Sequence, residues 1–438
     1  MSERDLAVAT PTGPALRLER LHPRRLARLA GAEWRTLTPR ARLVLALLLA
    51  GSAVGAVCAA VALPPGLEVM GTSPSVEWGL LIVGYVVFAI MTSGLCLTSS
   101  LGTVLGIDRY RPLERRHAIL AVLSLTTAFG VIILELHWPL RMLPGVILSP
   151  APSSPMWWMG VAYGGYLAIL VVEIWSMFTH RPRIHQIVCT MAAGMAIVAP
   201  STLGAVFGAL ANRPFWHGPI ASLWMLATAL LAGCALLGVV FALVVGLGHR
   251  GADEARDLVV PGLRPILAGL LLLSALFLVR LPIAAATSAE PGMADAVDAL
   301  MAGSLAPAFW IGRVALGLVL PFLLLVHPLA RRNGAFLAAS ALALAGVALD
   351  RTLYVIGGLI RPTSSSTGGV VARPDAVYVP SLVEIGIIVG AVSLVALAYL
   401  VLERYLDLGR YDRHVGFRLA PVRRWLASRR ESAGEAVS

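Results

Sequence analysis

Ionisable side chains interrupt long apolar stretches of this sequence, and their types suggest proton exchange with a bound molecule. Carboxylates and histidine can exchange protons with a ligand, while arginine can polarise a carbonyl oxygen or hold a carboxylate ionised. The candidate catalytic residues are Glu135, His137 and Asp350. The candidate ligand-binding residues are Arg141, Trp157, Ser201, Arg280, Arg313, Arg351, Tyr354 and Glu384.

The stretches that carry these residues have the length of transmembrane helices. Hydrophobic residues make up 58% of the chain and charged residues 13%, whereas an ordinary soluble domain has roughly 25% charged residues. A bilayer core of about 30 Å requires about 20 apolar residues per helix. We predict an all-α integral membrane protein with ten spans, at roughly 41–63, 78–106, 117–138, 156–178, 184–210, 220–247, 263–287, 304–329, 335–359 and 381–402.

The distribution of positive charge tests this number of spans independently, because cytoplasmic segments are enriched in basic residues. All 35 basic residues are arginines; with the N-terminus inside, 28 fall in inner segments and four in outer loops. A missed helix would scramble this alternation. We therefore predict a basic cytoplasmic segment over 1–40, a membrane domain over 41–402 and a basic cytoplasmic tail over 403–438, in a bacterial inner membrane. The basic charge needs no nucleic-acid partner.

This topology places seven ionisable residues in one layer near the outer face: Glu135, His137, Arg280, Arg313, Asp350, Arg351 and Glu384. One interpretation is three ion pairs that hold helices together, with the three arginines facing the three carboxylates. We favour a polar cavity, because buried charges in a membrane usually serve a function. Such a cavity suits a quinone, which needs an apolar slot, hydrogen-bond partners for its carbonyls and a proton-exchanging group. Only Glu173 lies in the inner half.

The cysteines and histidines argue against a cofactor held by this chain. The four cysteines all fall within spans and form no cluster spacing. The nine histidines lie in the tails or at span ends, so no pair at matching depth is placed to ligate a haem. We expect no haem, iron–sulfur cluster or metal in this chain.

Several strings, in order along the chain, resemble the NrfD family of membrane subunits related to polysulphide reductase, especially its longer ten-helix members. Residues 78–85 are similar to the opening of the family's second helix, and residues 154–158 to the start of a later one. Residues 135–141 keep the family's acid, proline and final arginine, with His137 and Trp138 in place of a glycine and an arginine. Further similar strings lie at 201–204, 214–216, 350–354 and 378–384.

The resemblance implies two four-helix bundles with flanking helices and a site for menaquinone or ubiquinone near the periplasmic face. Electrons would pass to or from a ferredoxin-like iron–sulfur subunit, which serves a catalytic molybdenum, hydrogenase or cytochrome subunit. Where the family often has His-Gln, this chain has Ala199 and Pro200. That histidine's role is therefore not carried over, and His137 or His217 would have to replace it.

Two other classes of function fit the same composition. A secondary transporter would also hold charges in a cavity, with inverted repeats and broken helices near the midplane. No repeat is evident, and the charges lie toward one face. A purely structural or proton-conducting membrane subunit is the other alternative.

The arginine distribution makes a topological prediction. Tags at the N-terminus, at Ala252 and at the C-terminus should report cytoplasm, and tags at Ala294 or Ser365 should report periplasm. Reporter fusions measure this directly. A periplasmic C-terminus would contradict the ten-span topology.

Overall fold

The computed structural model describes residues 39–63, 69–74, 76–136, 149–179, 181–246, 252–288, 292–328, 333–360, 363–364, 371–372 and 378–406. The chain divides into two compact units, Met1–Leu47 and Leu48–Ser438. Of the first unit, the structure describes residues 39–47. The predicted segment 1–40 and tail 403–438 lie almost wholly outside the described residues, as do His137 and Arg141.

Ten helices of the described part are long and apolar enough to cross a membrane, which confirms the predicted fold class. Two of the ten begin in a differently wound segment: η2 (Asp108–Leu113) leads into α4, and η4 (Ala308–Val319) continues as α11. The other bounds are α2 (Pro39–Ala62), α3 (Leu80–Thr103), α4 (Glu114–Glu135), α6 (Pro155–Phe178), α7 (Pro182–Gly208), α8 (Ile220–Gly246), α9 (Ala252–Thr287), α11 (Leu320–Val326), α12 (Asn333–Ile360) and α13 (Leu382–Leu406).

The predicted outer loops contain structure of their own. A short helix, α10 (Met293–Met301), follows Gly292, whose φ of 88° is left-handed. It buries Met293, Val297 and Leu300, which recur at helical spacing. Nine residues are too few to span a bilayer, so a search for spans does not find it. Two-residue strands, β1 (Thr363–Ser364) and β2 (Val371–Ala372), pair antiparallel beyond α12.

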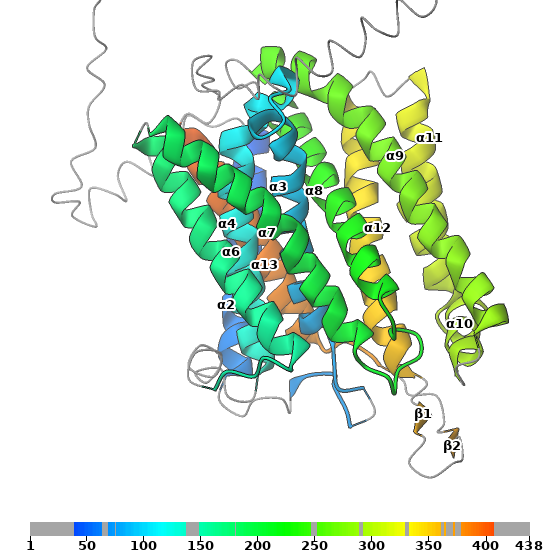
Figure 1. The fold of residues 1–438 in the computed structure, drawn as a ribbon. Helices are drawn as coiled ribbons and strands as arrows, with labels where there is room; N and C mark the ends of the chain where they lie inside the picture. Colours follow the sequence, from blue (N-terminus) through cyan, green and yellow to red (C-terminus); the bar gives the residue numbers. More distant parts are fainter. Residues whose placement is uncertain are drawn as a thin grey trace, which may run out of the picture. The chain divides into compact units, whose positions relative to one another are not determined.

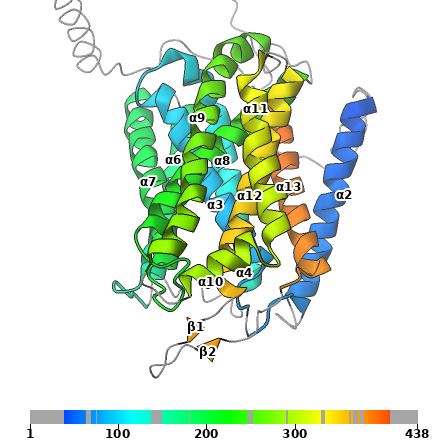
Figure 2. The same ribbon diagram turned by 90° about the vertical axis from the view of Figure 1, so that its right-hand side faces the viewer.

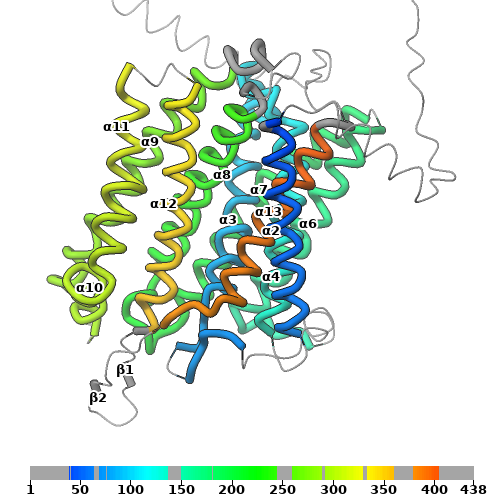
Figure 3. The backbone as a smooth tube through the Cα atoms, turned by 180° about the vertical axis from the view of Figure 1, so that it is seen from behind, coloured from blue at the N-terminus to red at the C-terminus, as the bar shows by residue number. Residues whose placement is uncertain are grey.

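The helices of Leu48–Ser438 form the two expected four-helix bundles (Figures 1 and 2). The first bundle contains α3, α4, α6 and α7, and the second contains α8, α9, α12 and the η4–α11 span. Helix α13 flanks the first bundle along α4 and α3. Residues 48–62 of α2 run beside α13 (Figure 3), where a Cβ on Gly55 would lie 2.4 Å from the Cα of Gly390. Small residues permit such close helix contact in membranes.

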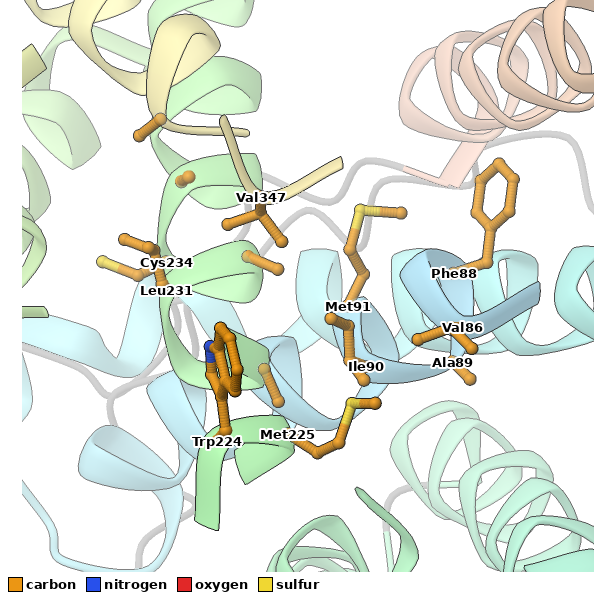
Figure 4. Close-up of a cluster of buried hydrophobic side chains, with 14 of the residues drawn as sticks. Val86, Phe88, Ala89, Ile90, Met91, Trp224, Met225, Leu231, Cys234 and Val347 are labelled. Carbon is orange, nitrogen blue, oxygen red and sulfur yellow. The ribbon is translucent and has the colours of Figure 1, made fainter. Parts of the chain in front are cut away.

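The two bundles meet where α3 and α8 are in backbone contact. A Cβ on Gly94 would lie 1.7 Å from the carbonyl oxygen of Ala229, and one on Gly233 would lie 1.9 Å from the carbonyl carbon of Gly94. Around this crossing, apolar side chains of α3 and α8 form a common core, with Met91 and Met225 among them (Figure 4). Glycine at both positions is therefore needed for this approach.

The η4 segment is a π-helix, with i→i+5 hydrogen bonds that widen its turns. Gly312 and Gly317, five residues apart, both face α12: their added Cβ atoms would lie 2.4 Å from Leu349 and 2.6 Å from Gly346. Arg313 follows the first of these glycines and is 1% exposed. The π-helical turns thus bring a buried arginine against α12.

The α3–α8 contact can be tested with a matched pair of glycine variants. Gly94→Ala should force the two backbones apart and destabilise the chain by about 1–3 kcal/mol. Gly130→Ala, on α4 with nothing within 4 Å of the added Cβ, should leave stability unchanged or raise it by up to about 1 kcal/mol. Thermal unfolding of the full-length chain in detergent measures both. Equal unfolding temperatures for the two variants would contradict the contact.

Candidate functional site

A buried carboxylate organises the end of the first bundle where α4 ends and α3 and α13 begin. The arginine distribution predicts that this end faces outward, and it is called the outer end below. Glu384 is 0% exposed. Its Oε1 accepts from the Tyr378 hydroxyl at 2.7 Å and the Leu80 amide at 3.2 Å, and its Oε2 accepts from the amides of Gly71 and Ser381, each at 2.8 Å. Several donors to one carboxylate stabilise its ionised form. Glu384 therefore ties together segments about 300 residues apart in the sequence.

Two glycines make room for this carboxylate. A Cβ on Gly79 would lie 2.4 Å from Oε1 of Glu384, and a Cβ on Gly71 would lie 2.9 Å from its Oε2. Burial and the hydrogen bond to Glu384 raise the pKa of Tyr378 above its ordinary value. The Tyr378 hydroxyl therefore keeps its proton and serves as a donor.

Glu135, the last residue of α4, lies beside this arrangement. Its carboxyl group is close to Glu384 and to the backbone amide of Gly79. Its Oε2 is buried and has no hydrogen-bond partner among the described residues. A buried polar atom without a partner is costly, so the site has capacity for a proton or a ligand donor at this oxygen.

An aromatic stack leads from this carboxyl pair to the second bundle. Trp78, directly before Gly79, stacks on Trp216 with ring centroids 5.2 Å apart. The Phe207 ring lies edge-on to both tryptophans, and Trp216 Nε1 donates to the carbonyl oxygen of Tyr354 at 2.7 Å. Trp216 fits only because Gly358 has no Cβ, since an added one would lie 2.1 Å from its ring. The stack forms a rigid apolar wall.

In the second bundle, Asp350 of α12 is held between two arginines. Its Oδ1 accepts from Nε of Arg313 at 2.8 Å, and its Oδ2 accepts from Arg351. Arg313 also donates to the Ser274 hydroxyl of α9 at 2.5 Å, and Arg351 Nη1 lies 2.9 Å from the sulfur of Met225 on α8. This buried network connects all four helices of the bundle.

A third arginine lies near the two that bind Asp350. Arg280 and Arg351 both lie over the Trp224 ring, 5.7 Å and 5.1 Å from its centroid, and among the described residues Asp350 is the carboxylate bonded to this group, through Arg313 and Arg351. Four buried donors in this group have no partner among the described residues: Arg280 Nε, Arg313 Nη1, Trp224 Nε1 and the Tyr354 hydroxyl. The adjoining cavity, lined in part by Phe215 and Leu300, has room for about one water molecule.

The comparison with known proteins agrees with this architecture. Residues 68–363 match the family model described as polysulphide reductase, NrfD. The chain belongs to the NrfD family. A putative membrane subunit of the dimethyl sulfoxide reductase of Halobacterium salinarum is 27% identical over 404 residues, which cover 84% of this chain and 91% of that protein.

Two further relatives span the NrfD-family chain with similar coverage. A selenate reductase subunit of Mesobacillus selenatarsenatis is 22% identical over 79% of this chain and 89% of its own length. An Hdr-like menaquinol oxidoreductase integral membrane subunit of Archaeoglobus fulgidus is 22% identical over 76% of this chain and 85% of its own length. Each of the three is named as a subunit of an oxidoreductase.

The structure separates the predicted site residues of this NrfD-family chain into two groups. Glu135 and Glu384 lie together at the outer end of the first bundle, while Arg280, Arg313, Asp350, Arg351 and Tyr354 lie together in the second. The three ion pairs of the packing interpretation do not form as such: both arginines bonded to a carboxylate share Asp350, and Glu384 binds backbone amides and a tyrosine.

Two predicted ligand-binding residues have local partners. The Ser201 hydroxyl donates to the carbonyl oxygen of Ile197 at 2.7 Å, and its own carbonyl accepts from Ser222 of α8. The Trp157 ring lies edge-on to Trp158 at 4.8 Å. These contacts link Ser201 to helix packing and Trp157 to the start of α6, and their predicted role with a ligand stays a prediction.

Sequence reasoning missed the side chains that complete both groups of the NrfD-family site. Trp78 and Tyr378 lie in strings that carried the resemblance and were assigned no role, although an aromatic residue beside a glycine is a signal of close approach. Ser274 and Trp224 gave no signal, because only the packing of α8 and α9 brings them to Arg313 and Arg351. Among the described residues, no group of three or more His, Cys, Asp or Glu side chains is placed to hold a metal ion.

The role of Glu384 in this arrangement can be measured. Glu384→Gln replaces an accepting oxygen by an amide nitrogen, so at least one buried backbone amide loses its acceptor. We expect a destabilisation of about 1–3 kcal/mol, measured by thermal unfolding of the full-length chain in detergent. Glu77→Gln, at an exposed acid of the same end, is the matched control and should unfold like the wild type. A Glu384→Gln variant as stable as the control would refute the role.

Proposed function

We propose that this NrfD-family chain is the quinone-reactive membrane subunit of a multi-subunit respiratory oxidoreductase. The family and the named relatives support a membrane subunit of such a complex. The name of the Archaeoglobus relative, a menaquinol oxidoreductase, supports a quinone as the molecule that reacts. The subunit is not catalytic alone, and its electrons come from or go to a partner.

The quinone head group binds beside Glu135 at the outer end of the first bundle. The observation that carries this assignment is the buried Oε2 of Glu135, which has no partner among the described residues and lies next to a fully bonded Glu384. Trp78 and the rings stacked on it supply an apolar wall for a planar ring. Tyr378 donates its hydroxyl proton to Glu384 of this pair.

Glu135 exchanges protons with the head group. Oxidation of a quinol releases two electrons and two protons, and reduction of a quinone takes up both, so a proton-exchanging group must lie within reach of the ring oxygen. His137 and Arg141, which follow Glu135 in the sequence, are proposed to relay the proton and to hold the head group. The electrons pass to or from a ferredoxin-like iron–sulfur subunit at the periplasmic face, which serves a catalytic subunit.

Asp350 has a different role from the proton exchange predicted for it. Two guanidinium groups already occupy its oxygens, so it acts as a counter-ion that positions Arg313 and Arg351. The adjoining cavity has room for about one water molecule, which is too little for a quinone ring. We therefore propose that the arginine group with Tyr354 supports the aromatic wall electrostatically and does not enclose the head group.

The proposal predicts a specific loss of quinone chemistry in Glu135→Gln. The amide keeps the shape of the side chain but removes proton exchange, so quinone-linked turnover of the assembled complex should fall by at least about tenfold. Dye-linked activity of the catalytic subunit and assembly of the complex should survive. Steady-state assays with a soluble quinone analogue and with a redox dye measure the two activities.

Glu77→Gln serves as the control, because Glu77 is an exposed acid at the same end of the bundle. It should retain wild-type turnover in both assays. If Glu135→Gln retains quinone-linked turnover, or if it abolishes assembly, then Glu135 is a helix-packing residue and the site lies elsewhere.

A further inference from the structure

A second set of ionisable side chains lies inside the first bundle, at the end opposite Glu135. His117 Nε2 of α4 lies 3.1 Å from Oε1 of Glu173 on α6. His185 Nε2 of α7 lies 2.5 Å from Oε1 of Glu114, the first residue of α4. The Cys189 thiol lies between the two pairs, 3.6 Å from Oε1 of Glu173 and 3.4 Å from Nε2 of His185. The four ionisable groups therefore form one connected series, here called the inner relay.

The inner relay runs from the surface into the bundle. The side chain of Glu114 is 24% exposed and that of His185 is 9% exposed, while those of His117 and Glu173 are 2% and 0% exposed. Arginines 109, 111, 115, 181 and 183 surround this end in the sequence, which the positive-inside rule assigns to the cytoplasm. Water at the arginine-rich end can therefore reach Glu114 but not Glu173.

The buried end of the inner relay is not saturated with hydrogen bonds. Oε2 of Glu173 and Nδ1 of His117 are both buried without a partner among the described residues. His185 has partners on both ring nitrogens, since its Nδ1 lies 2.9 Å from the Ser176 hydroxyl. Two open positions on a buried acid and a buried imidazole are the capacity that a proton acceptor needs.

The ion pair between Arg116 and Glu403, at the same end of the first bundle, differs from the inner relay in its hydrogen bonding. Glu403 of α13 accepts from Arg116 at 2.7 Å and 3.2 Å, and from the Tyr399 hydroxyl at 2.6 Å. Both of its oxygens are occupied, and its partner arginine does not lose its proton. The inner relay instead combines carboxylates with histidines, the side chains that gain and lose protons most readily near neutral pH.

Buried hydroxyl and thiol groups continue from the inner relay toward the outer end. Cys96 and Tyr166 lie near Glu173, and the Tyr166 hydroxyl donates to the carbonyl oxygen of Thr92 at 3.4 Å. Ser93 and Tyr163 follow one turn further out, and their buried side chains lie beside each other. These groups line the interior of the first bundle, between α3 and α6.

We propose that the inner relay is a proton-uptake path that admits protons from the arginine-rich side into the first bundle. A proton from water binds Glu114 and passes to Nε2 of His185. The Cys189 thiol gives its proton to the Glu173 carboxylate as it takes one from His185. Glu173 passes a proton to Nε2 of His117, whose Nδ1 proton is released toward the buried hydroxyls. Only protons move: water reprotonates Glu114, and the His117 ring returns to its Nδ1-protonated tautomer before the next transfer. The path itself is independent of the proposed quinone site; only the final use of the proton rests on it.

Infrared spectroscopy of the full-length chain in lipid nanodiscs tests the path without any redox partner. A protonated-carboxyl C=O band that disappears in Glu173→Gln should mark Glu173. After rapid transfer to heavy water the band should shift within the mixing time, and Glu114→Gln or His185→Gln should slow this exchange by about tenfold. Glu135→Gln identifies the band of the other buried carboxyl group.

Asp108→Asn is the matched control, because Asp108 is an exposed acid at the same end that pairs with Arg111. It should leave the Glu173 band and its exchange unchanged. The proposal is overturned if the wild-type chain shows no exchanging carboxyl band besides that of Glu135, or if exchange at Glu173 is equally fast without Glu114 and His185. The wild-type measurement decides even if Glu173→Gln fails to fold.

A second measurement separates this inference from the proposed function. In vesicles that contain the assembled complex, Glu114→Gln should reduce quinone-linked proton uptake from the arginine-rich side by about tenfold, with dye-linked activity retained. Unchanged uptake would overturn the use of the path in turnover. A wild-type complex without quinone-linked activity would refute the proposed function, and the infrared exchange would still decide the path.

Discussion

The cost of placing charge and polar backbone groups in hydrocarbon governs this structure. Each buried group must find a partner within the protein, since the bilayer core offers none. Three carboxylates meet this demand in different ways: Glu384 with backbone amides, Asp350 with two arginines, and Glu403 with an arginine and a tyrosine. In each case at least one partner lies on another helix, Leu80 for Glu384, Arg313 for Asp350 and Arg116 for Glu403, so binding the carboxylate also fixes how helices pack.

Glu135 and Glu173 depart from this pattern, and both lie in the first bundle. Each keeps a buried carboxyl oxygen without a partner in the described part of the chain. A buried carboxyl oxygen without a hydrogen bond is costly unless a proton or a ligand binds it. Glu135 and Glu173 are therefore the carboxyl groups best suited to bind one. Both carboxyl groups proposed to exchange protons thus lie in the first bundle, while the second bundle holds two buried arginines bonded to Asp350.

Hydropathy and charge were enough to predict the ten spans and the all-α fold. Each span is a local property of about 20 residues, and the arginines outside the spans fix the alternation. The groups that each buried carboxylate binds were not predictable in the same way. Glu384 binds amides near residues 71 and 80, and the sequence holds no local sign of contacts at that separation. The alternative interpretation, in which carboxylates face arginines, holds for Asp350 but not for Glu384, because charge counting does not reveal the backbone amides that Glu384 binds.

Two departures from regular helix geometry explain much of what remained hidden. The π-helical turns of η4 rotate Arg313 toward Asp350, whereas an α-helical reading of the same residues leaves its direction open. The histidines at inner span ends gave no sign of a connected series, because α4, α6 and α7 contribute one or two members each. Their meeting depends on how α4, α6 and α7 pack within the first bundle, while Gly94 and Gly233 let that bundle touch the second one through α3 and α8. Small residues that permit backbone contact therefore help to decide which charged groups can meet, including the members of the proposed proton path.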